Sequence, residues 1–299
     1  MYKLPTTAGA VFAFALLLIG CTSPNMPAIT EQPTGSSLPG KIVWHDLITD
    51  TPEQTKTFYG ELFGWEFEAV DTALSANLNY TLIRNEGRLI GGMVDQNLID
   101  TQKDISQWVA LISVEDVDSA VAVTTANGGR VITPPLNLAD RGRIAVIADP
   151  QGAIVTLLQS NAGDPLDGLE VASGGFLWNE LWTDAVGAAA EFYQALVGFE
   201  IVAAARVGQE YRVMKSQGQP RAGIMAMPVD DVAPIWVPYL RVTDDSELDA
   251  VVARVEKLGG SILLDPQDRQ IGGRAALIAG PSGAGIALQT WPIESGSGG

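Results

Sequence analysis

Histidine and cysteine are almost absent from this chain of 299 residues, which contains one of each, His45 and Cys21. A single cysteine excludes an internal disulfide. The length predicts two domains at roughly 150 residues per domain, and one histidine is too few to give each of them a Ser-His-Asp triad.

Basic residues are also scarce. The chain has 18 Lys and Arg residues and 35 Asp and Glu residues, so its net charge is −17. This balance argues against nucleic-acid binding, since the phosphate backbone would be repelled. It also argues against attachment to anionic lipid through a basic patch. We interpret the acidic residues as a solvated surface.

Residues 1–21 have the pattern of a targeting segment. Their amino terminus is positive, and the apolar run of residues 8–18 is too short for a membrane-spanning helix. The sequence Leu-Ile-Gly-Cys at residues 18–21 resembles the lipobox of bacterial lipoproteins. That resemblance implies cleavage before Cys21 and a lipid anchor on it in the cell envelope. Because Thr22 follows rather than an aspartate, it further implies the outer membrane, facing the periplasm. The alternative is an ordinary signal peptide with an incidental cysteine.

Two stretches rich in small and polar residues divide the rest of the chain. Residues 22–40 contain many Pro, Ser, Thr and Gly residues and predict a flexible tether. Residues 161–175 are rich in Gly, Asp and Pro and predict a linker. The folded domains are therefore expected at 41–160 and 176–293, followed by a disordered tail at 294–299.

The two expected domains are copies of one pattern. Trp44 and Phe58 recur as Trp178 and Phe192, and the two tryptophans are separated by the same interval as the two phenylalanines. Each copy begins with an apolar stretch typical of a half-buried strand and continues into a helix that ends at a glycine. Equal spacing of two landmarks indicates an internal repeat. Within each domain the predicted order is a βαβββ unit that occurs twice.

These motifs resemble the vicinal oxygen chelate superfamily, which includes glyoxalase I, extradiol dioxygenases and bleomycin-resistance proteins, and in particular its tandem, two-domain glyoxalase-like branch. The motifs are Phe-Tyr-x-x-Leu-x-Gly, Val-x-Asp-Val-Asp, Gly-Gly and Asp-Pro-x-Gly, at residues 58–64, 114–118, 128–129 and 149–152. The resemblance implies an α+β fold of two tandem domains, with four βαβββ modules. Curled mixed sheets would form two cups, with the helices outside.

The superfamily's metal chemistry uses His and Glu ligands inside the cup, and this chain lacks them. The corresponding positions carry Trp44, Val109, Thr156, Trp178, Val237 and Ala287. None of these side chains binds a metal well. His45 is one residue out of register, so strand alternation turns it towards the helices. We predict no metal cofactor and no glyoxalase I activity, and a divalent metal held by a divergent site is the alternative.

Strand alternation also selects the side chains that face into the cups. The candidates for ligand binding are Trp178, Glu180, Trp182, Tyr239, Arg241, Gln289, Trp44 and Asp46. Two Trp, a Tyr, a carboxylate, a guanidinium and an amide in the second cup suit a planar or mixed polar-aromatic small ligand. The alternative is that Glu180 and Arg241 pair with each other inside a closed barrel and that the tryptophans are core.

The sequence therefore predicts a membrane-anchored protein of glyoxalase or bleomycin-resistance type that binds a small molecule without a metal. Its partners would be that ligand and the membrane, not nucleic acid, and its two domains would pair within the chain. One alternative is a divergent metal-dependent lyase or dioxygenase of the same superfamily. Another is a non-catalytic interaction module of the envelope, with the cups filled by side chains.

Overall fold

The computed structural model describes residues 26–70, 79–168, 170–204, 210–229, 232–269 and 272–291. The expected signal peptide, Cys21 and the expected tail lie outside these residues. None of the helices in the described ranges is long and apolar enough to cross a membrane.

The first domain is one eight-stranded mixed sheet with two α-helices. Its elements in chain order are β1 (Ile42–Thr49), α1 (Pro52–Phe63), β2 (Glu66–Ala69), β3 (Thr81–Asn85), β4 (Arg88–Asp95), the 3₁₀ helix η1 (Gln96–Leu98), β5 (Gln107–Ser113), α3 (Val117–Ala126), β6 (Arg130–Leu138), β7 (Gly142–Ala148) and β8 (Ile154–Ser160). The strand order is β2-β3-β4-β1-β5-β8-β7-β6. Strand β1 is parallel to β4 and β5 is parallel to β8, whereas β1 and β5 are antiparallel.

The second domain repeats this arrangement. Its elements are β9 (Phe176–Thr183), α4 (Val186–Val197), β10 (Glu200–Ala204), β11 (Tyr211–Ser216), β12 (Gln219–Ala226), β13 (Ile235–Val242), α5 (Asp245–Val255), the 3₁₀ helix η2 (Glu256–Leu258), β14 (Ser261–Asp268), β15 (Arg274–Ala279) and β16 (Gly285–Thr290). The strand order is β10-β11-β12-β9-β13-β16-β15-β14. The predicted α+β fold of two tandem domains built from βαβββ modules is thereby confirmed.

The repeat is visible in how its first helices end. Helix α1 stops at Gly64 and α4 at Gly198, and both glycines are left-handed, with φ of 71° and 74°. Their backbone N–H groups bond to Gly60 and Gln194 at 2.9 Å. This is the C-terminal cap for which glycine is favoured, because it has no Cβ to clash at positive φ.

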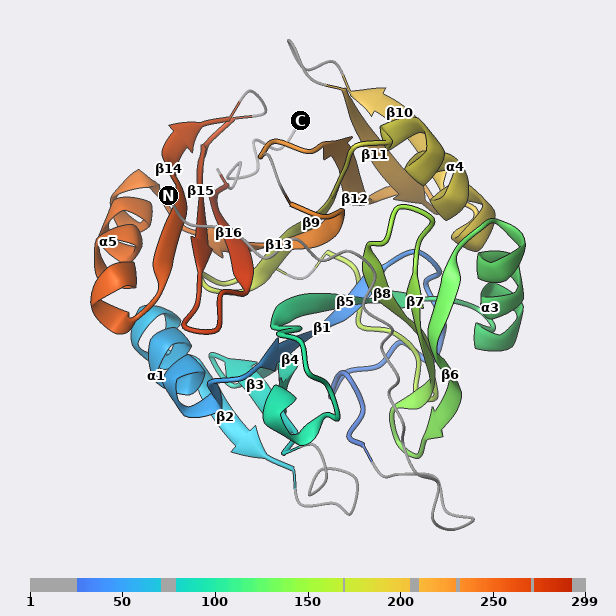
Figure 1. The fold of residues 1–299 in the computed structure, drawn as a ribbon, viewed down its shortest axis with the longest axis horizontal. Helices are drawn as coiled ribbons and strands as arrows, with labels where there is room; N and C mark the ends of the chain where they lie inside the picture. Colours follow the sequence, from blue (N-terminus) through green and yellow to red (C-terminus); the bar gives the residue numbers. More distant parts are fainter. Residues whose placement is uncertain are drawn as a thin grey trace.

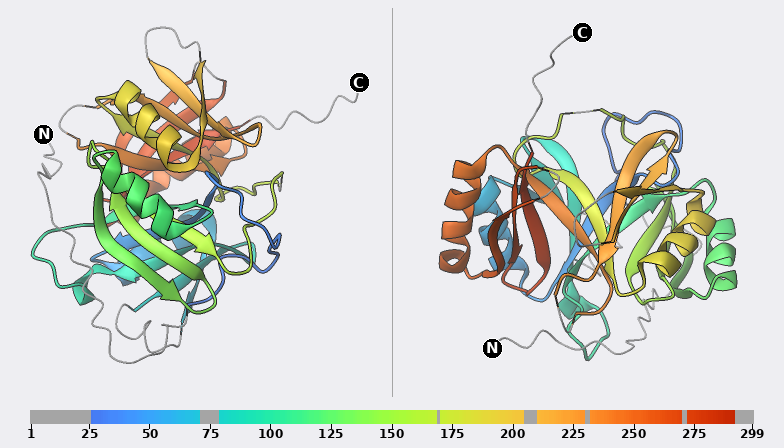
Figure 2. Two further views of the ribbon diagram at one scale, coloured as in Figure 1. Left: turned by 90° about the vertical axis from the view of Figure 1, so that its right-hand side faces the viewer. Right: turned by 90° about the horizontal axis from the view of Figure 1, so that it is seen from above.

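The domains pack through the faces of the sheets that carry the helices. Helix α1 lies beside α5 of the other domain, and α3 lies beside α4 (Figures 1 and 2). Two apolar clusters contain buried residues from both domains: one joins Ile112 to Tyr193, and the other joins Leu47 to Leu240. Since each cluster is shared, burial of apolar surface holds the two domains together.

His45 contacts the second domain directly. Its Nε2 is 2.7 Å from Asn179 Oδ1, and its ring stacks on Phe176 with centroids 3.8 Å apart. His45 and Asn179 are equivalent positions of the repeat, since each directly follows the tryptophan of its own copy. The predicted orientation of His45, away from the cup, is confirmed. Burial lowers the pKa of His45 to about 4, although its hydrogen bond with Asn179 opposes that shift, so the ring is neutral near pH 7.

Residues 26–40, part of the stretch for which a flexible tether is predicted, pack against the folded domains. Met26 and Ile29 are buried in the cluster that contains Trp44. The Ser216 hydroxyl donates to the Pro39 carbonyl at 2.6 Å, so this segment also touches the second domain.

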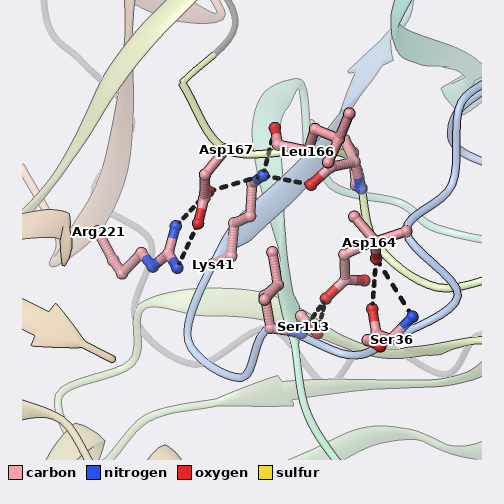
Figure 3. Close-up of polar contacts among 10 residues, drawn as sticks. Ser36, Lys41, Ser113, Asp164, Leu166, Asp167 and Arg221 are labelled. Atoms are coloured by element: carbon pink, nitrogen blue, oxygen red, sulfur yellow. Dashed lines mark hydrogen bonds and ion pairs between the residues drawn. The ribbon is translucent and has the colours of Figure 1, made fainter. Parts of the chain in front are cut away.

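The linker is fixed by an ion-pair cluster shown in Figure 3. The Asp167 carboxylate lies 3.0 Å from Lys41 Nζ and 2.6 Å from Arg221 Nη1, so it joins the first domain to the second. The neighbouring Asp164 is buried and accepts a hydrogen bond from the Ser113 hydroxyl. The two domains are therefore held together by polar contacts at the linker as well as by shared cores.

Candidate binding site in the first cup

The first cup, the face of the first sheet opposite the helices, contains a cavity of about 100 Å³. Strands β4 and β6 belong to different modules and both line it, so the sheet curls around the space. Most of its wall is apolar, and includes Ile48, Val94, Val109, Leu111, Ile144 and Val146. Two positions that correspond to metal ligands in the superfamily, Val109 and Thr156, lie in this wall.

Three of the side chains that line the cavity, Asp46, Tyr80 and Arg141, belong to a chain of hydrogen-bonded polar groups. Asp46 Oδ1 accepts hydrogen bonds from Trp44 Nε1 at 2.9 Å and from the Tyr80 hydroxyl at 2.6 Å. Arg141 Nη1 donates to the Tyr80 oxygen at 2.8 Å, and Arg141 Nε donates to the Pro27 carbonyl at 3.0 Å. Tyr80 thus bridges the carboxylate and the guanidinium. Burial raises the pKa of Tyr80 well above its usual value, so the hydroxyl keeps its proton and donates it to Asp46.

The Arg141 side chain is held between two aromatic rings. Its guanidinium carbon lies 4.9 Å from the Trp44 ring centroid and 5.2 Å from that of Tyr80. Such cation–π contacts partly replace the solvation that an arginine loses on burial. Arg141 is only 2% exposed and follows strand β6, in the hairpin before β7.

Two buried polar atoms of side chains that line this cavity have no hydrogen-bond partner among the described residues. They are Arg141 Nη2 and Thr133 Oγ1. Thr133 is 4% exposed, and both residues line the cavity. A buried donor or acceptor without a partner costs about 1–3 kcal/mol, so folded proteins rarely leave one without a role.

Gly92 makes room for Tyr80. A Cβ atom at this position would lie 1.9 Å from the Tyr80 hydroxyl and 2.6 Å from Asp46 Oδ1. Gly223 is its counterpart in the second domain, where a Cβ would lie 2.2 Å from the Tyr211 hydroxyl. The glycines allow each tyrosine to reach the carboxylate on the first strand of its own domain.

The second cup contains the same kind of constellation in a more tightly bonded form. Glu180 is fully buried and accepts hydrogen bonds from the Tyr211 hydroxyl at 3.0 Å, Trp182 Nε1 at 3.3 Å, Arg269 Nη2 at 2.8 Å and the Tyr239 hydroxyl. Trp178 Nε1 in turn donates to Tyr211 at 3.1 Å.

The partner of Glu180 differs from the one considered from the sequence. Arg269 makes the ion pair, and Arg269 Nη1 also donates to Gln289 Oε1. Arg241 instead donates from Nη1 to the Val171 carbonyl in the linker. The alternative in which Glu180 pairs with Arg241 is therefore wrong. Arg241 lies near the end of β13, where its long side chain reaches past the cup.

Of the eight candidates, seven contribute to the two cups as alternation predicts. Those in the second cup are Trp178, Glu180, Trp182, Tyr239 and Gln289, and those in the first are Trp44 and Asp46. Sequence reasoning missed Tyr80, Arg141 and Arg269. A signal existed for the tyrosine, because the interval from Tyr80 to Tyr211 equals the interval from Gly92 to Gly223.

The donor atoms present do not fit the metal that the superfamily implies. Within the described ranges no three His, Cys, Asp or Glu side chains are grouped closely enough to hold an ion. At the corresponding ligand positions Trp44, Val109, Thr156, Trp178, Val237 and Ala287 offer at most one hydroxyl oxygen. Zinc sites use three or four His, Cys or carboxylate ligands, and the described residues at these positions do not provide them.

Comparison with known proteins gives consistent matches over both domains. The model of the Glyoxalase/Bleomycin resistance protein/Dioxygenase superfamily matches residues 41–157 and 175–288. The chain is 32% identical over 246 residues to a Mycobacterium tuberculosis protein named "Putative glyoxylase CFP32", covering 81% of this chain and 91% of that protein. It is 31% identical over 265 residues to the anthracycline biosynthesis protein DnrV of Streptomyces peucetius, covering 84% and 93%.

Solved structures show the same fold. A Mn(II)-bound glyoxalase from Novosphingobium aromaticivorans superimposes with a TM-score of 0.56 at 15% identity, covering 85% of this chain and 82% of that one. An extradiol ring-cleaving dioxygenase from B. fuscum superimposes with a TM-score of 0.60 at 13% identity, covering 88% and 75%. With family motifs, sequence relatives and fold in agreement, the chain belongs to the Glyoxalase/Bleomycin resistance protein/Dioxygenase superfamily.

Proposed function

We propose that this protein binds a small organic molecule in its first cup and that it does so without a metal. The observation that carries the proposal is the cavity itself, which is lined mostly by apolar side chains together with a few polar ones. That combination is typical of small-molecule sites. A volume of about 100 Å³ is of the same order as the ~150 Å³ apolar cavity that accepts benzene in another protein. The ligand is therefore of the size of one ring.

The names of the two sequence relatives agree with this proposal. One is named as a glyoxylase and the other for the biosynthesis of an anthracycline, and both names refer to small organic molecules. A cup that is hollow also favours binding over the interaction module, which requires filled cups. No observation favours the metal-dependent lyase or dioxygenase, because that chemistry needs a donor set that the described residues do not provide.

The test is to fill the cavity and measure ligand binding. Val109→Phe adds a ring to the wall of the first cup, whereas Val202→Phe adds the same ring at an exposed position of β10. One-ring compounds such as toluene should raise the melting temperature of the wild type and of Val202→Phe. Saturation at a hundred times Kd stabilises by about 2.7 kcal/mol. Val109→Phe should lose the shift. If no one-ring compound shifts the wild type, or if Val109→Phe responds equally, the proposal is wrong.

We also propose that the protein is anchored to the cell envelope by a lipid on Cys21, in the outer membrane facing the periplasm. The lipobox-like sequence supports this. Met26 lines the first cavity and lies only five residues beyond Cys21. Five residues span at most about 18 Å, so the anchor would hold the first cup close to the membrane surface.

Cell fractionation tests the anchor. The wild type should be found in the outer-membrane fraction and gain the mass of a lipid, and Cys21→Ser should lose both properties. A wild-type protein that is released without detergent and carries no lipid would contradict the proposal.

A further inference from the structure

We propose that the first cup binds the carboxylate of a small monocarboxylic acid through Arg141 and Thr133, with the apolar part of that acid in the cavity. This inference rests on the proposed function and names the class of its ligand. It starts from two buried polar atoms without a partner among the described residues, Arg141 Nη2 and Thr133 Oγ1, which belong to side chains that line this cavity.

Two of the five N–H groups of Arg141 already have acceptors within the described part of the chain. Nε bonds to the Pro27 carbonyl and Nη1 bonds to the Tyr80 hydroxyl, and these two contacts fix the plane of the guanidinium. Nη2 carries two further N–H groups, and neither has an acceptor among the described residues. The guanidinium is therefore preorganised, and an acceptor that binds to Nη2 does not have to order the side chain.

In the second cup, the protein itself supplies an acceptor for the Nη2 atom of the corresponding arginine. There Arg269 Nη2 bonds to Glu180 at 2.8 Å, and Nη1 bonds to Gln289. Arg269 comes from the hairpin between β14 and β15, and Arg141 comes from the corresponding hairpin between β6 and β7. In the second cup, a carboxylate of the protein thus binds the arginine directly. In the first cup, no carboxylate among the described residues does so.

One difference between the two cups is a methylene group. Glu180 and Asp46 occupy equivalent positions on the first strand of each domain, two places after the tryptophan of the repeat. The longer glutamate reaches its arginine directly, whereas Asp46 ends at Tyr80 and Trp44 and meets Arg141 only through the tyrosine. The space that a longer side chain would fill is left for the carboxylate of a ligand.

Charge favours a carboxylate over a neutral acceptor. The described residues place no carboxylate in direct contact with Arg141, and charge-assisted hydrogen bonds are roughly twice as strong as neutral ones. Burial of the ligand's anion is also compensated, because it pairs with a buried cation. The apolar wall formed by Ile132, Leu138 and Val146 suits a ring or a branched hydrocarbon as the rest of the ligand.

Three probes with the same ring distinguish this inference from the proposed function. Titration calorimetry of the full chain would compare benzoate, benzamide and toluene. We expect benzoate to bind at least about tenfold more tightly than benzamide, which corresponds to one charge-assisted contact. Toluene should bind through the apolar wall alone.

Variants locate the carboxylate. Arg141→Met should abolish the preference for benzoate over benzamide. Arg143→Met removes a neighbouring arginine that pairs with Asp118 outside the cup, so it should leave the preference unchanged and serve as the control for net charge. Thr133→Val should weaken benzoate severalfold.

Asp46→Glu keeps Arg141 and so decides the matter even if Arg141→Met does not fold. By analogy with Glu180, the longer carboxylate should reach Arg141 and exclude benzoate while the chain stays folded. If the wild type binds benzoate no more tightly than benzamide, or if Asp46→Glu still binds benzoate, the inference is wrong. Binding of toluene in that case would leave the proposed function standing. If none of the three probes binds, both are wrong.

Discussion

The buried ion pair of the second cup gives the sharpest stability prediction. Glu180 is fully buried, the Arg269 side chain is 11% exposed, and they meet at 2.8 Å. Arg269→Met removes the cation and leaves the carboxylate buried. Breaking such a pair costs about 3–5 kcal/mol. Because Glu180 still accepts hydrogen bonds from the Tyr211, Trp182 and Tyr239 side chains, we expect the lower end, about 3 kcal/mol.

A matched control separates burial from the loss of an arginine. Arg274→Met is the same substitution on the adjacent strand β15, where Arg274 meets Asp249 at 3.1 Å and the aspartate is 58% exposed. Exposed pairs contribute about 0–1 kcal/mol. The assay is urea unfolding followed by tryptophan fluorescence, with the free energy of unfolding obtained by linear extrapolation.

A double variant tests whether the cost comes from the stranded charge. Adding Glu180→Gln to Arg269→Met removes that charge but keeps an amide oxygen that can accept from the tyrosine hydroxyls. We expect the double variant to be about 1 kcal/mol more stable than Arg269→Met alone, which is a coupling within the usual range. If Arg269→Met costs no more than Arg274→Met, the reasoning is refuted.

Two further predictions concern the interface and the first cup. The pKa of His45 is lowered from 6.5 to about 4 by burial, so the unfolded chain binds a proton in this window that the folded chain does not. Stability therefore falls as the pH drops from about 6.5 to about 4, by up to about 1.4 kcal/mol per pH unit and about 3 kcal/mol in all. His45→Gln should remove this component of the pH dependence. The measurement is the free energy of unfolding of wild type and variant at pH 7 and at pH 4.5. If both proteins lose the same stability between these pH values, the prediction is wrong. Gly92→Ala should cost about 1–3 kcal/mol, because the new methyl group displaces Tyr80. Gly187→Ala, in helix α4 where a Cβ would come no closer than 3.7 Å to a neighbour, should instead stabilise by about 0.5–1 kcal/mol; thermal unfolding that gave both variants the same sign would show that the Gly92 contact is misassigned.

The fold could be predicted from the sequence because the same residues recur at a fixed interval in the two halves of the chain. Trp44 and Trp178 mark the first strand of each domain, and alternation along those strands then places Asp46 and Glu180 inside the cups. This works because a strand has a strict period of two, so one landmark sets the direction of its neighbours.

The arginines could not be placed in this way. Arg141 and Arg269 lie in hairpins after the strands have ended, where no periodicity fixes the direction of a side chain, and they occupy different positions in the two hairpins. For Arg241, alternation gave the correct face of the strand but the wrong contact. Its long side chain extends out of the cup and donates a hydrogen bond to the linker. Alternation gives the direction of a Cβ atom, and the destination of a guanidinium several bonds further on depends on the partners available.

Crystals soaked with 4-bromobenzoate provide the most direct test of the binding site. Bromine scatters anomalously, so its position can be read without bias from the protein. We predict one bromine site in the apolar part of the first cup, with the carboxylate at hydrogen-bond distance from Arg141 Nη2. Bromine on the outer surface only, or a carboxylate that points away from Arg141, would contradict this account.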